Sequence, residues 1–353
     1  MVAGIEELTF EVSGVPVNLQ TNKAFRQWLQ HHIGKEAEVS DLSQPSSGLS
    51  SQTLIFRLRA ADMDQRVVMR AGAKGRALFP VYDMGAQAGV MRALMQAEIP
   101  VPRLMWSEAD SAILGAPFLI MEYVPGDIPS DSAPGFHGHG IYFDATEVER
   151  AAMWRAGVEH LAALHRLDWR SLDLPNLPGT ADDIRGTIAG HIELLESWVQ
   201  WGSMENISVI QRGIRWLKET PAPVSTTTFL WGDARPGNII HREGNPVALL
   251  DWELASIGLP AFDLFYWWWS SEVLAEVNHI PRLRGLPDRD STIAIYERAF
   301  GQSIKDSAEY AETYALLRLV IMGVLGVRAS VSEVYTEDYL VENGVMRALS
   351  ARL

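Results

Sequence analysis

The segment from Phe229 to Asp263 constrains the fold of this chain more than any other stretch. It contains Asp233, then Asn238 five positions later, and then a second acidic residue, Asp251, beyond two short apolar runs. The apolar runs flank a Glu-Gly-Asn turn at 243–245, which predicts a β-hairpin. Strands advance about 3.3 Å per residue, so the outgoing and returning strands bring Asp251 back beside Asn238.

The oxygens of these side chains indicate a particular chemistry. Carboxylate and amide oxygens are hard ligands suited to Mg²⁺, so Asn238 and Asp251 are placed to share a cation. Phosphoryl transfer from ATP needs positioned Mg²⁺ and a group that orients the attacking hydroxyl. Protein kinases supply both with an Asp-x-x-x-x-Asn loop followed by a second Asp. The alternative is that Asp233 is a turn residue and Asn238 a cap, because the short motif also occurs by chance.

The first third of the chain has the pattern of a small sheet with one main helix. Apolar runs and alternation, bounded by turn residues, indicate strands, and periodic apolar spacing indicates helices. Strands are predicted at Thr53–Arg59, Arg66–Arg70, Arg103–Ser107 and Pro117–Val124, and helices at Ala24–Ile33 and Asp83–Ala97. A stretch rich in Pro, Gly, Ser and Asp follows, from Pro125 to Gly138, and predicts a linker or surface loop.

The rest of the chain is mainly helical apart from the hairpin. Helices are predicted at Ala145–Arg166, Ala181–Trp201 and Ser208–Glu219, with further helices to the end, and hairpin strands at Ile239–Arg242 and Val247–Leu250. We therefore predict an α+β, bilobal protein-kinase-like fold. Residues 1–124 would form a small β-rich nucleotide-binding lobe, and residues 125–353 a helical catalytic and substrate-binding lobe.

Four motifs in this sequence resemble the phosphotransferase enzyme family that includes aminoglycoside phosphotransferases and choline-kinase-like proteins. They are Trp-Gly-Asp-Ala-Arg-Pro-Gly-Asn at 231–238, Leu-Asp-Trp-Glu at 250–253, Gly-Ala-Pro-Phe-Leu-Ile-Met-Glu-Tyr-Val-Pro-Gly at 115–126 and Leu-Ala-Ala-Leu-His at 161–165. The similarity covers about residues 35 to 330. It is closest to the aminoglycoside phosphotransferase branch that shares Trp-Gly-Asp-Ala-Arg and Asp-Trp-Glu.

The resemblance implies roles for four residues. Asp233 would be the catalytic base or the group that orients the hydroxyl, and Asn238 and Asp251 would be the Mg²⁺ ligands. Asp263 would brace the catalytic loop through its backbone. The alternative for Asp263 is an acid in the first turn of a helix, favoured there by the helix dipole. Trp231 stands where the family usually has His.

The resemblance also implies contacts to ATP. The segment at Glu122 and Tyr123 would be the hinge whose backbone bonds adenine. The Ser-rich turn at 45–51 would cover the phosphates, since backbone N–H groups and Ser hydroxyls can bind phosphate oxygens, although a plain turn is also consistent with its single glycine. The candidate nucleotide contacts are Ser47, Gly48, Ser50, Glu122, Tyr123 and Arg70.

Arg70 stands where kinases place a strand Lys that holds the α- and β-phosphates. A guanidinium stays charged and can bind phosphate oxygens bidentately, so we predict that Arg70 takes this part. The helix Glu that usually pairs with that Lys is absent, and Gln87 lies near its place as structural support. The alternatives are that Arg70 is an ordinary strand-end residue and that Lys74 or Arg76 assists with the phosphates.

Composition narrows the partners and the compartment. The net charge of −14 repels phosphate backbones, so nucleic acid is not expected as a partner. The absence of cysteine excludes disulfides and thiolate chemistry. The N-terminal residues are acidic, unlike a signal peptide, and the apolar run 314–327 is interrupted by Arg318, which predicts a buried helix. We expect a cytoplasmic monomer or homodimer that does not bind a membrane.

The predicted function is phosphorylation of a hydroxyl group on a small molecule with ATP and Mg²⁺. The sequence leaves the acceptor open between an aminoglycoside-like and a hydroxyacyl-type alcohol. Candidate substrate contacts are Glu253, Arg235 and Trp267. The alternative function is a catalytically weak nucleotide-binding pseudo-enzyme with a signalling or scaffolding role. The departures at Arg70 and Gln87 favour that alternative, and the intact Asp233, Asn238 and Asp251 oppose it.

Overall fold

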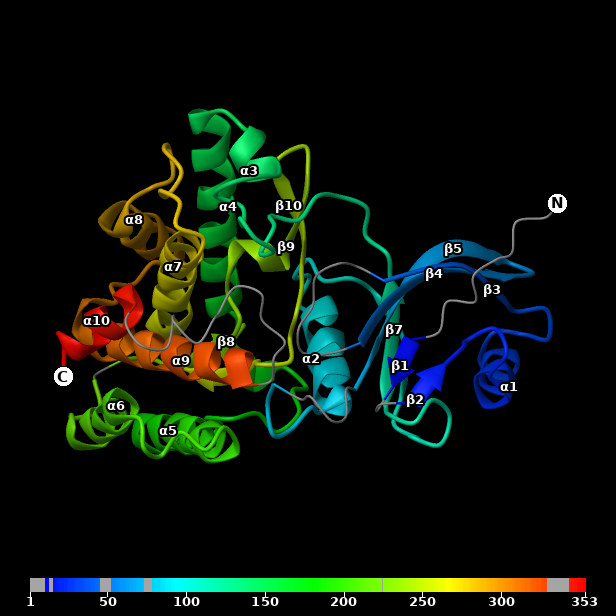
Figure 1. Ribbon diagram of the computed structural model, residues 1–353, viewed down its shortest axis with the longest axis horizontal. Coiled ribbons are helices and arrows are strands. Elements are labelled where there is room, and N and C mark those ends of the chain that lie inside the picture. The colour runs from blue at the N-terminus through cyan, green and yellow to red at the C-terminus, as the bar shows by residue number, and fades with distance from the viewer. Residues whose placement is uncertain (1–9, 13–14, 45–51, 73–77, 224, 329–342) are drawn as a thin grey trace. The chain divides into compact units, whose positions relative to one another are not determined.

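The computed structural model describes residues 10–12, 15–44, 52–72, 78–223, 225–328 and 343–353, and its contacts divide the chain into two compact units (Figure 1). Unit 1 comprises Met1–Arg92 and Pro102–Val124, and unit 2 comprises Ala93–Val101 and Pro125–Leu353. The short segment Ala93–Val101 belongs to unit 2, where the carbonyl of Pro100 accepts a hydrogen bond from the N–H of Leu249 (2.7 Å). The β-rich first part and helical second part confirm the predicted α+β, kinase-like fold.

Unit 1 is built on a five-stranded antiparallel sheet in the order β3-β4-β5-β7-β6. The strands are β3 (Glu38–Ser43), β4 (Gln52–Ala60), β5 (Met63–Ala71), β6 (Leu104–Glu108) and β7 (Phe118–Glu122). A separate pair, β1 (Phe10–Val12) and β2 (Val15–Val17), and the helix α1 (Lys23–His32) accompany it. Helix α2 (Met84–Gln96) begins in unit 1, and its residues from Ala93 onward belong to unit 2. The four predicted strands of this part are confirmed as β4 to β7, whereas β1, β2 and β3 were not predicted.

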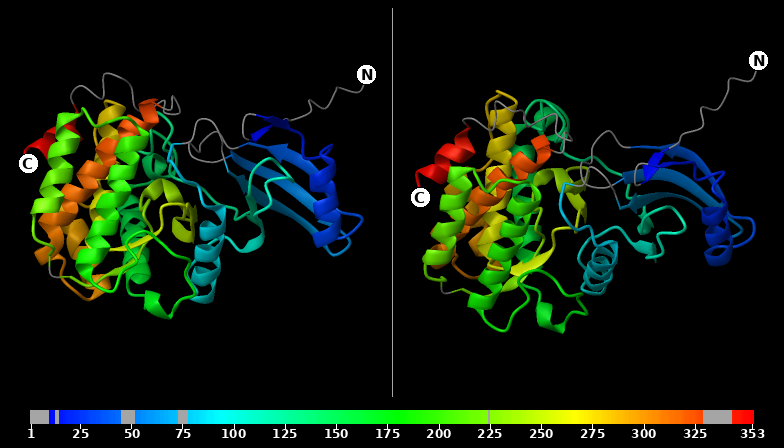
Figure 2. Two further views of the ribbon diagram at one scale, coloured as in Figure 1. Left: turned by 90° about the horizontal axis from the view of Figure 1, so that it is seen from below. Right: turned by 60° about the horizontal axis from the view of Figure 1, so that its bottom comes forward.

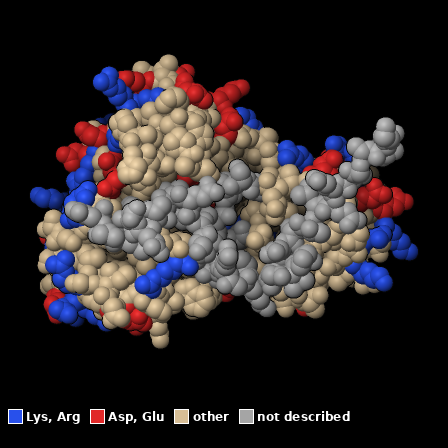
Figure 3. All heavy atoms as spheres, in the orientation of Figure 1, with Lys and Arg blue, Asp and Glu red and all other residues tan. Residues whose placement is uncertain are grey.

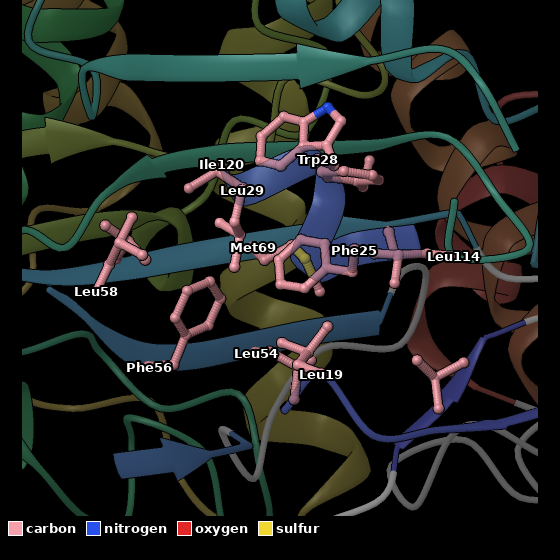
Figure 4. Close-up of a cluster of buried hydrophobic side chains, with 14 of the residues drawn as sticks. Leu19, Phe25, Trp28, Leu29, Leu54, Phe56, Leu58, Met69, Leu114 and Ile120 are labelled. Carbon is pink, nitrogen blue, oxygen red and sulfur yellow. The ribbon is translucent and has the colours of Figure 1, made fainter. Parts of the chain in front are cut away.

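The core of unit 1 lies between α1 and one face of the sheet (Figure 4). Phe25 and Trp28 of α1 pack edge-to-face on Phe118 of β7, with ring centroids 5.9 and 5.1 Å apart. Strand alternation directs Val67 and Met69 of β5 into the same core, and both are fully buried. Arg70, one position after Met69, therefore lies on the opposite face of the sheet.

Unit 2 is mainly helical. Its helices are α3 (Ile141–Asp144), α4 (Glu147–His165), η1 (Trp169–Ser171), α5 (Ile184–Trp201), α6 (Ser208–Glu219), η2 (Pro236–Asn238), α7 (Pro260–Val277), α8 (Arg289–Phe300), η3 (Lys305–Ser307), α9 (Ala308–Arg328) and α10 (Gly344–Ser350). Figure 2 shows α7 lying along α9, and α4 likewise packs against α8. A capping box at Thr146 and Glu149 starts α4 where the sequence analysis predicted a helix.

Two short strand pairs sit among the helices of unit 2. The hairpin strands are β9 (Ile239–Arg242) and β10 (Asn245–Leu249), and β8 (Thr228–Leu230) pairs with β11 (Ser256–Gly258). Arg242 pairs with Asn245, so Glu243 and Gly244 form a two-residue turn, with φ values of 52° and 76°. Positive φ at both turn residues matches the twist of a hairpin, as the Glu-Gly-Asn sequence predicted.

The Pro/Gly/Ser/Asp-rich stretch at 125–138 contains no helix or strand, in agreement with the predicted linker or surface loop, but part of it is packed into unit 2. Asp127 forms a two-way backbone bridge with His241 of β9, with both N···O distances 2.8 Å. Further along, Phe136 and His137 are almost completely buried, and His137 Nε2 lies 3.0 Å from the carbonyl of Ser271. The stretch is therefore exposed at its start, and around Phe136 and His137 it belongs to the interior of unit 2.

The apolar segment 314–327 lies within α9, as the predicted buried helix. One helix in the described part of the chain, Lys305–Arg328, is long and apolar enough to cross a membrane by length and composition. In this structure 89% of its apolar window is buried inside the protein, as in the core helix of a folded domain.

Candidate active site

The loop after β8 is held at its start by Asp263. Oδ2 of Asp263 accepts the N–H of Trp231 (2.7 Å), and Oδ1 accepts the N–H of Gly232 (3.1 Å). Gly232 has φ of +85°, and a Cβ there would lie 1.8 Å from the carbonyl oxygen of Leu254, so only glycine fits. These contacts are those expected of a brace through the backbone, and Asp263 also lies in the first turn of α7.

Asp233 follows this braced turn, and both of its carboxylate oxygens accept side-chain hydrogen bonds. Oδ2 accepts from Asn238 Nδ2 (2.7 Å) and Arg235 Nε (2.9 Å), and Oδ1 accepts from the hydroxyl of Tyr266 (2.7 Å). A carboxylate offers about four lone-pair positions. Oδ2 is therefore fully used, whereas Oδ1 keeps a position for one further donor.

The electrostatic surroundings keep Asp233 ionised. Burial alone would raise its pKa, but the charge of Arg235 and the hydrogen bonds from Tyr266, Arg235 and Asn238 outweigh burial, so the pKa is lowered. Burial and the nearby Asp233 carboxylate raise the pKa of Tyr266 well above its usual value, so the phenol keeps its proton and donates. The site therefore presents a charged acceptor at neutral pH.

Arg235 joins the loop to the segment that precedes α3. Its guanidinium forms ion pairs with Asp233 and with Asp131, which lies 104 positions earlier in the chain. Asp131 also rests on the loop itself, because a Cβ on Gly237 would come within 2.1 Å of its Oδ2. The sequence analysis predicted Arg235 as a substrate contact. In the structure its guanidinium contacts two carboxylates, which gives it the additional role of positioning Asp233. Its contact with a substrate stays a prediction.

Asn238 and Asp251 lie at the same end of the hairpin, as the spacing predicted. The carbonyl of Asn238 accepts the N–H of Leu250 (2.8 Å), which places the residue before Asp251 directly beside Asn238. Because Asn238 Nδ2 faces Asp233, the amide oxygen is turned the other way. Asp251 adopts a left-handed backbone with φ of 62°, which Asp tolerates better than most residues. The pair of oxygen donors fits a magnesium ion.

No group of three or more His, Cys, Asp or Glu side chains with metal-binding geometry is present in the part of the chain that the structure describes. The proposed site has a different composition, because it consists of one amide, from Asn238, and one carboxylate, from Asp251. It would leave most positions around Mg²⁺ to water and phosphate oxygens, which is how this ion is usually bound. The prediction that both side-chain oxygens reach one cation remains a prediction.

Two buried residues, Trp231 and His165, stabilise the loop that carries Asp233. The indole Nε1 of Trp231 donates to the carbonyl of Leu250 (2.7 Å) and its ring stacks on Trp252 at 5.6 Å. Trp231 thus supplies a polar link to the Asp251 segment. The ring of His165, the last residue of the Leu-Ala-Ala-Leu-His motif, lies 3.2 Å from Asp263 Oδ2 and 2.6 Å from the Tyr296 hydroxyl. It therefore supports Asp263.

Unit 1 carries the candidate phosphate contacts. Arg70 is only 9% exposed on β5, so it is not the solvated strand-end residue of the alternative interpretation. Gln87 of α2 is 3% exposed, and neither its Oε1 nor its Nε2 has a hydrogen-bond partner among the described residues. A buried, unpaired amide is costly unless a ligand or water completes it. The predicted contacts Ser47, Gly48 and Ser50 lie outside the described residues, as do Lys74 and Arg76.

The backbone N–H groups of the predicted adenine hinge already have hydrogen-bond partners within the protein. The N–H of Glu122 donates to the carbonyl of Arg103 (2.9 Å), and the N–H of Tyr123 donates to that of Arg66 (3.3 Å). The Glu122 carboxylate pairs with Arg103, and the Tyr123 ring lies 4.1 Å below the Arg66 guanidinium. Both N–H groups are therefore used within the sheet, and neither is a donor to a base in this conformation.

The remaining substrate candidates differ in exposure. Trp267 was predicted to contact substrate, but it is fully buried, and its indole packs on Gly157 of α4 and edge-to-face on Trp154. We correct this prediction, because a side chain without exposed surface contributes to the core of unit 2. Glu253 is partly buried in the turn after Asp251.

Sequence reasoning missed two of the groups that contact this site. Tyr266 directly precedes the Trp267-Trp268-Trp269 run, of which the sequence analysis chose Trp267 as a candidate contact. Asp131 was hidden in the stretch predicted as a linker. The only sequence signal for either residue is chemical: a hydroxyl beside an aromatic run, and a carboxylate in a Pro- and Ser-rich loop.

We expect replacement of Tyr266 by Phe to raise the pKa of Asp233, because the Tyr266 hydroxyl stabilises the carboxylate form. The protonation of Asp233, followed by ¹³C NMR of its carboxyl carbon, should then occur at higher pH than in the wild type. The matched control is Tyr310→Phe, which removes a buried hydroxyl that donates to the carbonyl of Leu217 (2.9 Å). An unchanged titration in Tyr266→Phe would contradict the hydrogen bond.

Comparison with known proteins agrees with this geometry. Residues 41–295 match the model of the phosphotransferase enzyme family. The chain is 29% identical over 304 residues to human acyl-CoA dehydrogenase family member 11, covering 81% of this chain and 36% of that protein. It is 31% identical over 276 residues to mouse acyl-CoA dehydrogenase family member 10, covering 76% of this chain and 24% of that protein. The chain thus spans about a third or less of the length of these relatives.

Solved structures share the fold. A protein of Ralstonia eutropha, provisionally described as an aminoglycoside phosphotransferase, superposes with a TM-score of 0.66 at 22% identity, covering 94% of both chains. Choline kinase from Cryptosporidium parvum gives a TM-score of 0.58 at 14% identity, covering 93% of this chain and 94% of that one. A ternary complex of aminoglycoside phosphotransferase APH(4)-Ia with AMP-PNP and hygromycin B gives 0.57 at 16%, covering 94% and 99%.

Proposed function

The chain belongs to the phosphotransferase enzyme family, and from this premise we propose that it transfers a phosphoryl group from ATP to a hydroxyl of a small molecule. The observation that carries the proposal is the state of Asp233. Its carboxylate is ionised and buried, is held by three side chains, and keeps one accepting position on Oδ1. A group of this kind orients a hydroxyl and accepts its proton.

The residues of unit 2 have separate parts in the proposed reaction. Oδ1 of Asp233 accepts the hydrogen bond of the acceptor hydroxyl and takes its proton as the acceptor oxygen forms a bond to the transferred phosphorus, with ADP as the leaving group. Tyr266 and Arg235 hold the carboxylate in place from its two sides. Asn238 and Asp251 would hold the metal. When bound, Mg-ATP supplies the transferable phosphoryl group and the cation that neutralises its charge.

Arg70 is proposed to bind the ATP phosphates, and its replacement tests the nucleotide half of the function. We expect Arg70→Ala to weaken Mg-ATP binding by about tenfold to a hundredfold, because a charge-assisted contact is lost. Arg70→Lys should rescue binding only partly, since an ammonium lacks the guanidinium fork. Isothermal titration with a non-hydrolysable ATP analogue measures both. Arg57→Ala, which breaks an exposed pair with Asp64, is the control. Equal affinities in all four proteins would contradict the assignment.

The acceptor is proposed to be a small alcohol. Two chemical classes of alcohol are considered, cationic alcohols and hydroxyacyl compounds. The structural relatives include proteins named for aminoglycosides, choline and ethanolamine, which are cationic. The curated relatives include proteins named as acyl-CoA dehydrogenase family members, and this name favours an acceptor with an acyl group, such as a hydroxyacyl compound. The net charge of −14 does not decide between them, because acidic and basic side chains are intermixed on the face shown in Figure 3.

The test is a phosphoryl-transfer assay with Mg²⁺ and ³²P-labelled ATP against a panel of alcohols. The panel contains an aminoglycoside, choline, ethanolamine and a hydroxyacyl thioester. Labelled product that requires both Mg²⁺ and one of these acceptors supports the proposal. A folded protein that binds Mg-ATP but labels none of them would favour the pseudo-enzyme alternative.

A further inference from the structure

Arg318 of α9 is a buried cation close to the proposed catalytic carboxylate. It is 3% exposed. Its guanidinium carbon lies 5.0 Å from the ring centroid of Tyr266 and 5.6 Å from that of Trp198 on α5. Tyr266 is the residue whose hydroxyl bonds Asp233 Oδ1. Arg318 is thus separated from the proposed site of hydroxyl activation by one aromatic side chain.

The charge of Arg318 is not neutralised by any residue that the structure describes. No carboxylate in that part of the chain lies within ion-pair distance of its guanidinium, and its buried Nε has no hydrogen-bond partner. The ionisable side chains whose pKa it influences are Tyr266, Tyr314 and His191, and none of them is an acid that could pair with it. Burial lowers the pKa of His191 to about 4, so that ring is neutral at physiological pH.

A buried guanidinium without a counter-ion is unfavourable. Cation–π contacts with aromatic rings offset part of the free energy lost on dehydration of the guanidinium. They do not replace the hydrogen bonds of its five N–H groups. Elsewhere in unit 2 the chain pairs such cations. Arg282 also lies against two indoles, those of Trp154 and Trp268, yet it has an ion pair with Glu272 (2.8 Å). Arg282 thus has an acidic partner, whereas Arg318 has none among the described residues. We infer that the anion for Arg318 comes from outside those residues.

The geometry points to the acceptor substrate as the source of that anion: we propose that the molecule phosphorylated by this protein carries a carboxylate or phosphate group that binds Arg318. This inference rests on the proposed function and specifies its substrate class. Asn238, the proposed metal ligand, bonds Oδ2 of Asp233, so the metal and the ATP phosphates belong to that side. Tyr266 and Arg318 lie on the side of Oδ1, where the acceptor hydroxyl has its free position.

The charge of Arg318 has a consequence for the rival acceptors. A polycationic aminoglycoside or a choline-like cation would bring a second positive charge toward an uncompensated one, and like charges in a buried site repel strongly. An anionic alcohol gains a charge-assisted, bidentate contact at the same place. The acceptor class is therefore expected to be opposite in charge to the aminoglycosides.

The experiment uses four three-carbon alcohols that carry a phosphate, a carboxylate, no charged group or an ammonium: glycerol 3-phosphate, glycerate, glycerol and 3-amino-1,2-propanediol. Binding to the full chain is measured by isothermal titration calorimetry without nucleotide. We expect at least one anionic probe to bind more tightly than glycerol, and the amine to bind least. Comparison of the phosphate with the carboxylate identifies which anion the site takes. Binding without dependence on probe charge, or no binding of either anion, would overturn the inference.

Variants assign the effect to one side chain. Arg318→Met keeps the length and apolar stem, and we expect it to weaken the anionic probe by about tenfold to a hundredfold. Arg318→Lys keeps the charge and should retain part of the affinity. Arg282→Met is the matched control, since it removes an arginine that lies between aromatic rings but is already paired. Equal anion affinity in the wild type and Arg318→Met would show that Arg318 has only a packing role.

Nucleotide binding separates this inference from the proposed function. Mg-ATP affinity should be the same in Arg318→Met and the wild type, and a loss confined to ATP would place the anion site with the donor and overturn the inference. Phosphoryl transfer to neutral or cationic alcohols without preference for an anion would contradict this inference alone. Mg-ATP binding without transfer to any alcohol would contradict the proposed function itself.

Discussion

Replacing Asp233 by Asn should lower kcat by about a hundredfold to ten-thousandfold while leaving Mg-ATP affinity nearly unchanged. The amide keeps the shape of the side chain but removes the charge that orients the hydroxyl and accepts its proton. Asp233 accepts hydrogen bonds from Tyr266, Arg235 and Asn238, which all belong to unit 2. Nucleotide binding therefore does not depend on the charge of Asp233 alone. Steady-state transfer kinetics and titration with a non-hydrolysable ATP analogue measure the two quantities separately.

The design needs a control for the loss of one negative charge. Asp168, an exposed carboxylate that begins η1 without a capping hydrogen bond, is suitable, and Asp168→Asn should leave kcat unchanged. Circular dichroism and thermal unfolding establish that both variants are folded. A folded Asp233→Asn protein with wild-type turnover would remove Asp233 from the mechanism.

The fold was predictable where local periodicity reports burial. The bounds predicted for α6 and β9 agree with the structure. An amphipathic helix and a short apolar strand each have a hydrophobic pattern that can be recognised in the sequence. Strand β3 (Glu38–Ser43) was missed for a physical reason. Four of its six residues are polar and none is fully buried, and its two apolar residues, Val39 and Leu42, are three positions apart, so no alternation is visible. Its pairing with β4 also shifts register between Ser40 and Ser43.

The site was predictable only where its residues are close in the sequence. Asp233 and Asn238 lie in one loop, and the hairpin length fixes the return of Asp251. Tyr266 could not be distinguished from Trp267, because adjacent helix positions differ by about 100° and periodicity does not say which one faces a loop. In the structure Tyr266 faces Asp233, whereas Trp267 faces Gly157.

Two contacts of the site depend on tertiary structure alone. Asp131 reaches Arg235 over 104 positions, and no local pattern encodes such a pairing. Arg318 was read as an interruption of an apolar helix, which suggested burial but not a function. Its significance follows from what surrounds it, namely two aromatic rings and no acid among the described residues.

Replacing Asp263 by Ala should lower the free energy of unfolding by about 3–5 kcal/mol. Asp263 has no exposed surface, and its carboxylate accepts the N–H groups of Trp231 and Gly232 and contacts His165. Alanine would leave two backbone donors buried without partners, and each such donor costs about 1–3 kcal/mol. Urea unfolding followed by tryptophan fluorescence measures the change.

The matched control for Asp263→Ala is Asp288→Ala, because both carboxylates accept backbone N–H groups and differ in burial. Asp288 caps α8 at the surface, with Oδ1 2.8 Å from the N–H of Ser291. Water replaces an exposed cap, so the cost there should be about 1 kcal/mol. The braced loop also carries Asp233, so we expect Asp263→Ala to reduce phosphoryl transfer at temperatures where the protein is still folded. Equal losses of stability in the two variants would show that Asp263 acts only as an acid in the first turn of α7, without bracing the catalytic loop.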